Sequence, residues 1–171
     1  MYCIDGNDRV IELTDLPQCD IGAPLPSLVA TERQTFLIYY LQNVPPGWDG
    51  TSVRVVGPNA DGERVAIISF KHCLAHMFGP PNDEAFEGHP LAKLGLHPYS
   101  VFRIENSSWV RTLERMNAVH PHHRPETMLS LSHYIFAFHD SMFECIASAY
   151  QIEVHKASIR NALGRLAMAI D

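Results

Sequence analysis

The stretch from residue 132 to residue 150, SHYIFAFHDSMFECIASAY, constrains the fold more than any other part of the chain. Side chains alternate between the two faces of a β-strand, so Tyr134, Phe136 and Phe138 share one face of a strand over residues 132–140. Three aromatic side chains on one face require a second layer to bury them. The sequence therefore predicts a hairpin of two long strands, residues 132–140 and 142–154, whose aromatic face belongs to the core.

The turn of this hairpin is expected at Asp140 and Ser141, because both side chains can bond to nearby backbone groups. A two-residue turn there would place His139 opposite Met142 and would make Glu144 a diagonal neighbour of His139, roughly 7–8 Å away. Asp-Ser is not a pair favoured in two-residue turns. A slip of one residue would reverse the faces of one strand relative to the other, so the predicted neighbours of His139 depend on the register.

The composition of the 171 residues indicates a folded, acidic domain. Hydrophobic residues make up 46% of the chain and charged residues 19%, which is typical of a globular protein rather than a disordered one. The formal net charge is −6, and Lys and Arg form no long cluster, so we expect neither nucleic acid nor an anionic membrane as a partner. No apolar run approaches the length of about 18 residues that a transmembrane helix needs.

Four cysteines are spread widely along the chain, at Cys3, Cys19, Cys73 and Cys145. They form no C-x-x-C pair, which excludes a zinc ribbon and a thioredoxin-type motif. The first ten residues have neither the basic nor the apolar region of a secretory signal. We therefore expect a cytoplasmic protein with reduced thiols.

The first half of the chain contains two clear strand patterns. Residues 35–42, TFLIYYLQ, form an almost continuous apolar run typical of a strand buried on both faces, although a short buried helix has the same pattern. Residues 63–70 alternate as a strand after a strong turn signal, and residues 52–56 are expected to form a hairpin with them. Residues 1–33, rich in Pro and Gly after residue 16, are expected to form an extended arm with a short strand at residues 10–13.

Residues 72–99 form a long segment in which four prolines and four histidines are mixed with Asp83, Glu84 and Glu87. Long structured loops in compact domains are commonly functional. Five large apolar residues in this segment are enough to anchor it, and residues 83–86 and 90–93 could each form a helical turn. We expect an ordered loop that brings ionisable groups to the body of the domain.

The second half predicts two helices. A helix is expected from residues 106–108 to about residue 119, with Trp109, Leu113 and Met116 on one apolar stripe, and it follows a strand at residues 100–104. A C-terminal amphipathic helix is expected over residues 155–170. Sequential hairpins with a middle and a C-terminal helix predict a single α+β domain with a mostly antiparallel sheet of six or seven strands. A small β-barrel with flanking helices is the alternative.

The histidines and carboxylates suggest a metal site for zinc, iron or manganese. Candidate ligands are His139 and Glu144, together with His72 and His76, which are four residues apart. Four residues on a helix would let the two histidines share an ion, whereas four residues on a strand would separate them by about 13 Å. The sequence contains no H-E-x-x-H motif. The competing interpretation is that the histidines are surface residues, helix caps or hydrogen-bonded core residues.

The same histidines and carboxylates also suggest acid–base catalysis without a metal. A histidine held by a carboxylate is a base matched to neutral pH. If the loop over residues 72–99 folds over the open end of the sheet, its acids could face the hairpin turn. The expected catalytic residues are His139, Asp140, Glu144, Asp83 and Glu84, and the expected ligand contacts are His89, Phe138, Trp109 and His133.

The leading hypothesis is thus a small-molecule site between the sheet and residues 72–99, used for acid–base or metal-assisted catalysis. The alternative is a binding or interaction protein without catalysis, with a homodimer as one form of it, in which the histidines serve structure or a response to pH. A Cys–His pair is a weaker candidate. Cys145 falls on the predicted core face, and His72 and Cys73 would point to opposite faces of a strand.

Overall fold

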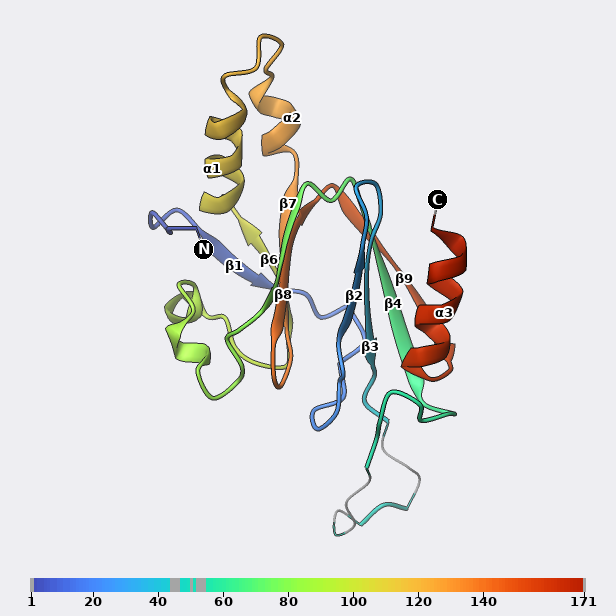
Figure 1. Cartoon of the computed structure of the whole chain (residues 1–171). Helices are drawn as coiled ribbons and strands as arrows, with labels where there is room; N and C mark the ends of the chain where they lie inside the picture. The colour runs from blue at the N-terminus through green and yellow to red at the C-terminus, as the bar shows by residue number, and fades with distance from the viewer. Residues whose placement is uncertain (1, 44–46, 50, 52–54, 171) are drawn as a thin grey trace.

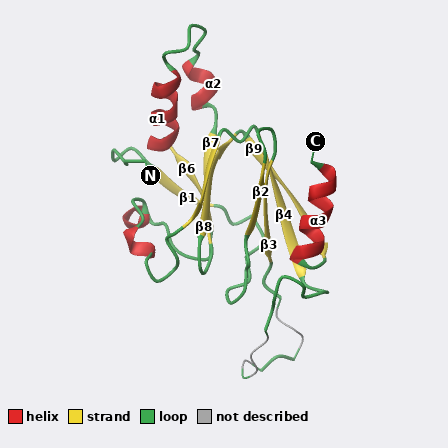
Figure 2. Cartoon of the chain, in the orientation of Figure 1, coloured by secondary structure: helices red, strands yellow, loops and turns green. Residues whose placement is uncertain are grey.

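The computed structural model describes residues 2–43, 47–49, 51 and 55–170. Within these residues the chain forms nine strands and three α-helices (Figure 1, Figure 2). They are, in chain order, β1 (Arg9–Glu12), β2 (Ser27–Ala30), β3 (Thr35–Tyr40), β4 (Arg64–Lys71), β5 (Ala75–Gly79), β6 (Val101–Glu105), α1 (Ser108–Asn117), α2 (Pro125–Leu129), β7 (Ser132–Ala137), β8 (Met142–Ala147), β9 (Ala149–Lys156) and α3 (Ile159–Ala169). Two 3₁₀ turns, Phe86–Gly88 and Ala92–Leu94, lie between β5 and β6.

The strands form two antiparallel sheets that face each other (Figure 1). One sheet has the order β1-β6-β7-β8-β5, and the other has the order β2-β3-β4-β9. The predicted α+β class is confirmed. The predicted single sheet of six or seven strands is wrong, because nine strands are divided between two sheets. Both sheets have edge strands, so the part of the chain that the structure describes contains no closed barrel.

Two strand pairs pass from one sheet into the other. β4 continues into β5, and β8 continues into β9, so the pairs β4·β9 and β5·β8 lie in different sheets. Where the two segments bend from one sheet into the other, they are joined by hydrogen bonds from Leu74 N–H to Ile146 O (2.8 Å) and from Ser148 N–H to Lys71 O (2.9 Å). The strand predicted over residues 142–154 is therefore interrupted at Ser148. The two sheets arise from this interruption and from the matching bend between β4 and β5, because the segments β4–β5 and β8–β9 each contribute one strand to each sheet.

The main core lies between the two sheets and contains the predicted aromatic face. Tyr134, Phe136 and Phe138 are buried there, as the alternation of residues 132–140 predicted. Other members come from both sheets and from the segment that joins β1 to β2: Leu16, Cys19, Leu37, Tyr39, Leu41, Ala66, Ile68, Phe70, Phe143, Cys145 and Ala147. Aromatic rings meet across the interface, with the Phe70 and Phe143 centroids 5.3 Å apart.

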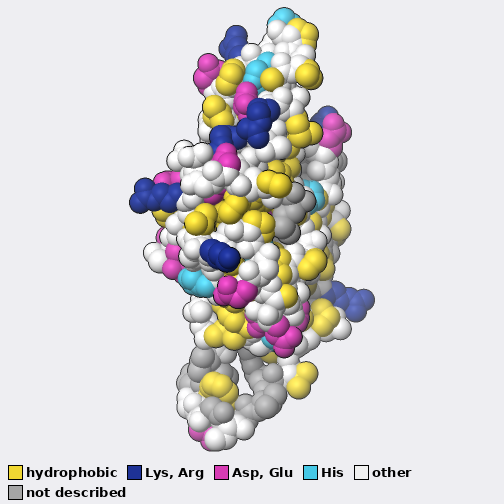
Figure 3. Space-filling model, turned by 90° about the vertical axis from the view of Figure 1, so that its left-hand side faces the viewer, with side chains coloured by type: hydrophobic (Ala, Val, Ile, Leu, Met, Phe, Trp, Pro, Cys, Tyr) yellow, Lys and Arg dark blue, Asp and Glu magenta, His cyan; other side chains and the backbone are white. Residues whose placement is uncertain are grey.

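Each sheet is also covered on its outer face. Helix α3 packs on the four-stranded sheet through Ile159 and Ala162, which are buried with Ile38, Tyr40 and Val65. The five-stranded sheet is covered by the start of α1, by residues 80–98 and by Tyr2. Figure 3 views this side of the molecule and shows acidic, basic and apolar side chains interspersed over it. Strand β7 is therefore buried on both faces, which explains its nearly continuous apolar sequence.

Several predicted boundaries need correction. Residues 1–33 are not a simple arm, because they supply β1 to one sheet and β2 to the other. Residues 72–99 include the edge strand β5. The C-terminal helix begins at Ile159 rather than His155, because the Ser158 side chain accepts a hydrogen bond from Asn161 N–H and caps it there. Residues 52–54 of the strand predicted at 52–56 lie outside the described residues, and β4 pairs with β3 and β9.

The helices of the described residues are short. Helix α1 ends at Asn117, two residues before the predicted end, and the short α2 beginning at Pro125 was not predicted. The stripe predicted for α1 is buried only near its start, since Trp109 is 8% exposed and Met116 is 67% exposed. No helix in the described ranges combines the length and the apolar character needed to cross a lipid bilayer.

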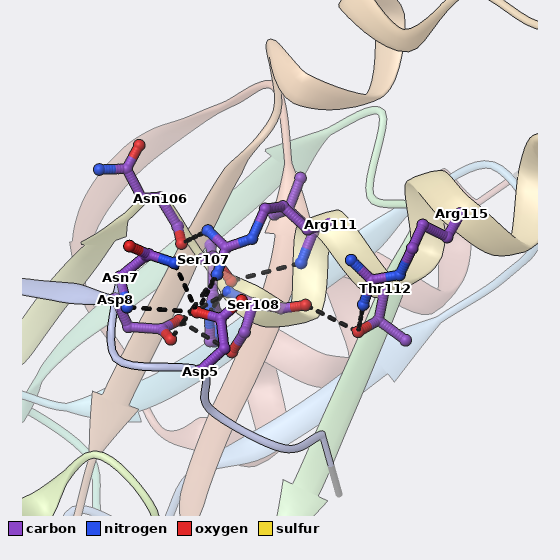
Figure 4. Close-up of polar contacts among 11 residues, drawn as sticks. Asp5, Asn7, Asp8, Asn106, Ser107, Ser108, Arg111, Thr112 and Arg115 are labelled. Atoms are coloured by element: carbon purple, nitrogen blue, oxygen red, sulfur yellow. Dashed lines mark hydrogen bonds and ion pairs between the residues drawn. The ribbon is translucent and has the colours of Figure 1, made fainter.

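Asp8 ties the N-terminal segment to the start of α1 (Figure 4). Its Oδ1 accepts hydrogen bonds from Ser108 N–H (2.6 Å) and from the Ser108 hydroxyl (2.9 Å). Ser107 caps the same helix, because its Oγ accepts from Val110 N–H (3.3 Å). A buried carboxylate at a helix N-terminus also interacts favourably with the helix dipole. This contact holds residues 2–8 against the outer face of the five-stranded sheet.

Replacing Asp8 by Ala is expected to lower the free energy of unfolding by about 1–2 kcal/mol, the usual effect of removing a helix cap. Equilibrium urea denaturation followed by circular dichroism measures this change. Asp5→Ala is the control, since Asp5 is exposed and bonds to Arg111 rather than to the helix backbone. An equal or larger loss from Asp5→Ala would show that Asp8 has no special role.

Candidate functional site

The register of the β7–β8 hairpin decides which groups meet near its turn. Ala137 pairs with Met142 and Ile135 pairs with Glu144, and Phe138 N–H bonds to Ser141 O (2.9 Å). The predicted pairing of His139 with Met142 is therefore wrong by two residues. Asp140 and Ser141 do not form a two-residue turn by themselves, and the loop takes in residues 138–141. A shift of two residues leaves the faces unchanged but moves Glu144 away from His139.

Glu144 instead lies at the centre of a buried polar cluster. Its Oε2 accepts hydrogen bonds from the Tyr2 hydroxyl (2.8 Å) and from His133 Nε2 (2.9 Å). Its Oε1 accepts from His89 Nε2 (3.2 Å). The exposed fractions are 2% for Glu144, 3% for His89 and 0% for His133. The predicted site residues Glu144, His89 and His133 are thus brought together, inside the domain.

The hydrogen bonds define the protonation of this cluster. His89 Nδ1 accepts from Leu91 N–H (3.2 Å), so the ring proton of neutral His89 is on Nε2, where it donates to Glu144. His133 Nδ1 lies 2.9 Å from the Ser107 hydroxyl. Burial would raise the pKa of Glu144, but the hydrogen bonds from His133 and His89 outweigh it and lower the pKa to about 2. Glu144 is therefore an ionised carboxylate held by three donors.

Aromatic packing fixes the geometry of the cluster. Tyr2 stacks on Trp109 with ring centroids 5.4 Å apart, and Trp109 meets His133 edge-on at 5.1 Å. Burial and the charge of Glu144 raise the pKa of Tyr2 well above its ordinary value, so its hydroxyl remains a donor. Trp109, predicted as a ligand contact, is thus part of the core that supports Glu144. A small depression of about 180 Å³, lined by residues of β5 and by Met142, reaches Glu144.

A second polar cluster lies at the hairpin turn and joins it to residues 80–98. Asp83 Oδ2 lies 2.9 Å from His139 Nδ1 and also accepts a hydrogen bond from the Tyr99 hydroxyl. The Asp83 N–H donates to His139 O (2.9 Å), which fixes the loop to the turn. The side chains of His139 and Asp83 are 41% and 19% exposed. The predicted meeting of the loop acids with His139 is therefore observed for Asp83.

The charge state of Asp83 follows from its two donors. The hydrogen bond from Tyr99, supported by the one from His139, lowers the pKa of Asp83 below its ordinary value. The same bond raises the pKa of Tyr99 to about 12. An ionised Asp83 can only accept, so His139 Nδ1 must carry a proton. In neutral His139 the free lone pair then lies on Nε2, which has no hydrogen bond to any described residue.

A cavity of about 240 Å³ opens between the two sheets beside this second cluster. Its walls come from residues 12–14 and 16–19, from Tyr39 on β3, and from Phe136 and Phe138 in and just after β7. Tyr99, which bonds to Asp83, is also part of the wall. Of the four predicted ligand contacts, which are His89, Phe138, Trp109 and His133, only Phe138 is in this wall. We name this space the inter-sheet cavity.

The remaining predicted site residues do not join either cluster. Asp140 and Glu84 are exposed, Asp140 in the hairpin turn and Glu84 after Asp83. His72 bonds to the Ser148 hydroxyl (3.1 Å), whereas His76 is an exposed residue of strand β5, so the helical arrangement that would let them share an ion is not formed. Across the described ranges, no group of three or more His, Cys, Asp or Glu side chains has the arrangement of a metal site.

All four cysteines are free, and Cys73 has the most unusual environment. A hydrogen bond from the Cys145 thiol, helped by Thr35 and His76, lowers the pKa of Cys73 to about 6 although burial opposes it. Burial raises the pKa of Cys145 well above its ordinary value, consistent with its predicted place in the core. The histidine that interacts with Cys73 is thus His76 and not the adjacent His72.

Tyr2, Ser107 and Tyr99 were not predicted as site residues. All three reach their partners through contacts between distant parts of the chain: Tyr2 is 142 residues from Glu144, and Ser107 is 26 residues from His133. No local pattern marks such contacts.

Comparison of the chain with protein-family models, with curated protein sequences and with solved structures found no match. The two polar clusters and the inter-sheet cavity are therefore the features from which a function can be inferred.

Proposed function

We propose that the protein is an enzyme that catalyses proton transfer on a small molecule, with His139 as the general base. The observation that carries this proposal is the contact of Asp83 with both His139 Nδ1 and Tyr99, while His139 Nε2 bonds to no residue that the structure describes. A histidine oriented by a buried or half-buried carboxylate is a recurring arrangement for proton transfer at neutral pH. Glu144, by contrast, is enclosed and serves the stability of the fold.

The proposed step is a simple proton transfer. The lone pair of His139 Nε2 forms a bond to a substrate hydrogen, the bond between that hydrogen and the substrate breaks, and the electron pair stays on the substrate. Asp83 stabilises the resulting imidazolium, and Tyr99 holds Asp83 in place through its hydroxyl. The proton then returns to the substrate or passes to water.

The inter-sheet cavity supports this proposal because its wall includes Tyr99, which bonds to Asp83. Tyr99 belongs to both features, so a molecule that fills the cavity and extends past Tyr99 would reach the Asp83–His139 pair. Small-molecule sites are concave and use polar groups to orient the ligand, and the inter-sheet cavity has Tyr39 and Tyr99 in its wall.

Binding without catalysis is the second candidate. It is favoured by one observation: His139 is not among the residues that line the inter-sheet cavity. A carrier or sensor of a small molecule would need the cavity alone. The two candidates differ in whether the bound molecule exchanges protons.

Proton exchange gives a direct test. Small uncharged molecules that raise the melting temperature are incubated with the protein in D₂O, and loss of their C–H signals is followed by NMR. We expect deuterium to enter a bound compound, and His139→Gln to slow this exchange by roughly 10²–10⁴-fold, the usual contribution of a general base. Asp83→Asn should slow it less, because the base is misoriented but present.

Glu87→Gln is the matched control, since Glu87 is an exposed acid in the same segment. It should leave the exchange rate unchanged. Equal exchange in the wild type and in His139→Gln would overturn the proposed role of His139. Compounds that bind without exchange or other chemical change would support the second candidate instead.

A further inference from the structure

We infer that the inter-sheet cavity binds an uncharged aromatic carbonyl compound, and that the Tyr39 hydroxyl donates a hydrogen bond to its carbonyl oxygen. The inference rests on the proposed function and deepens it by naming the substrate class. Carbonyl compounds also carry acidic hydrogens beside the carbonyl group, which are suitable for proton transfer.

The first observation is the state of the Tyr39 hydroxyl. Tyr39 is 1% exposed and forms part of the cavity wall. Among the described residues, its hydroxyl has no hydrogen-bond partner. Buried hydroxyl groups are normally bonded, so an unpartnered one beside a cavity marks the place of a missing polar group. Burial, with the proximity of Cys19 and Tyr150, raises the pKa of Tyr39, which therefore stays a neutral donor.

The second observation is the electrostatic character of the wall. Of the residues that line the inter-sheet cavity, Glu12 alone carries a formal charge, and it lies 3.6 Å from His97 at the surface. Burial raises the pKa of the Cys19 thiol to about 11, so this group is neutral as well. No lining residue is a Lys, Arg or His that could compensate an anion. Burial of a charged ligand without a partner is unfavourable, so the wall selects an uncharged molecule.

The third observation is size and shape. A protein cavity of roughly 150 Å³ is sufficient to hold benzene. The inter-sheet cavity, at about 240 Å³, therefore has room for one aromatic ring and a few further atoms. The rings of Phe138 and Phe136 lie 5.2 and 6.3 Å from the ring of Tyr39, and these three rings provide an aromatic wall. A phenyl ketone matches this combination of volume, aromatic wall and buried Tyr39 donor.

Two probes of nearly the same shape test the inference. Acetophenone has a carbonyl oxygen, and ethylbenzene does not. Both are titrated into the ¹⁵N-labelled protein, and shift changes at residues 13–19, at Tyr39 and at residues 136–138 report binding in the cavity. We expect the wild type to bind acetophenone about 5- to 10-fold more tightly than ethylbenzene, as one net hydrogen bond predicts.

Tyr39→Phe should remove this preference, so that both probes bind with similar affinity. The variant should fold, because an unpartnered hydroxyl contributes no hydrogen bond to stability. Tyr134→Phe is the matched control: it removes a hydroxyl from the same core, but Tyr134 is not in the cavity wall. The control should keep the preference for acetophenone. Equal binding of both probes to the wild type, binding elsewhere, or a preference that survives in Tyr39→Phe would overturn the inference.

The outcome is separable from that of the proposed function. If acetophenone binds through Tyr39 but its methyl hydrogens do not exchange in D₂O, the substrate class for binding stands and catalysis by His139 on it fails. If acetophenone does not enter the cavity but another compound exchanges protons in a His139-dependent manner, the inference fails and the proposed function stands.

Discussion

Replacing Glu144 by Ala is expected to lower the free energy of unfolding by roughly 3–5 kcal/mol, the effect of removing one partner from a buried charged cluster. Three donors, from Tyr2, His89 and His133, lose their acceptor in this variant. A buried donor left without a partner retains its desolvation penalty, and the vacated volume adds the effect of a cavity. Glu144→Gln should destabilise less, because it keeps the volume and one acceptor oxygen.

Guanidinium chloride denaturation of the wild type and both variants measures this effect. Glu153→Ala provides the matched control, since Glu153 also bonds to a histidine, His155, at 2.9 Å, but its side chain is 72% exposed. Exposed ion pairs contribute little to stability, so the control should unfold almost as the wild type does. A loss of less than about 1 kcal/mol for Glu144→Ala would contradict the role given to the cluster.

The stability of the protein should fall steeply between pH 5 and pH 2. The pKa of Glu144 is lowered from 4.5 to about 2 in the folded state, so its contribution is fully present above the unfolded value and is lost as the pH falls toward the folded value. This difference between the two pKa values corresponds to a contribution of roughly 3 kcal/mol to the free energy of unfolding. Protonation converts the acceptor carboxylate into a neutral acid that no longer suits three donors.

Urea midpoints measured from pH 6 to pH 2.5 test this prediction. Asp83 and Asp5 also have a lowered pKa and contribute in the same direction, so the comparison must be made with Glu144→Gln, which retains both. Between pH 6 and pH 2.5 the free energy of unfolding should decrease less in Glu144→Gln than in the wild type, by most of the roughly 3 kcal/mol that Glu144 contributes. Parallel pH profiles for the two proteins would show that Glu144 is not the group responsible.

The faces of the central hairpin could be predicted from the sequence, but its register could not. Alternation alone places Tyr134 and Phe136 in the core, because the period of a strand is two residues. The register depends on the turn, where Asp140 and Ser141 have no strong preference for one turn type. The shift of two residues replaced His139 by His133 as the neighbour of Glu144.

The candidate site could be predicted only in part, for the same physical reason. His89, Glu144, Asp83 and His139 were recognised because residue types with suitable chemistry are concentrated near the hairpin turn and in residues 72–99. Their pairing depends on where the loop lies on the sheet, and this is decided by contacts between distant residues. Tyr39 illustrates the limit: its sequence context predicts a buried strand, and nothing local indicates a hydroxyl without a partner.

The most direct test of the central claim is the tautomer of His139, measured by long-range ¹H–¹⁵N NMR at alkaline pH, where imidazole is neutral. If Asp83 orients His139 as a base, the proton is on Nδ1 and Nε2 shows the chemical shift of an unprotonated nitrogen. Asp83→Asn should disturb this pattern. A proton on Nε2 in the wild type would contradict the claim, because Nε2 would then have no lone pair with which to accept a proton.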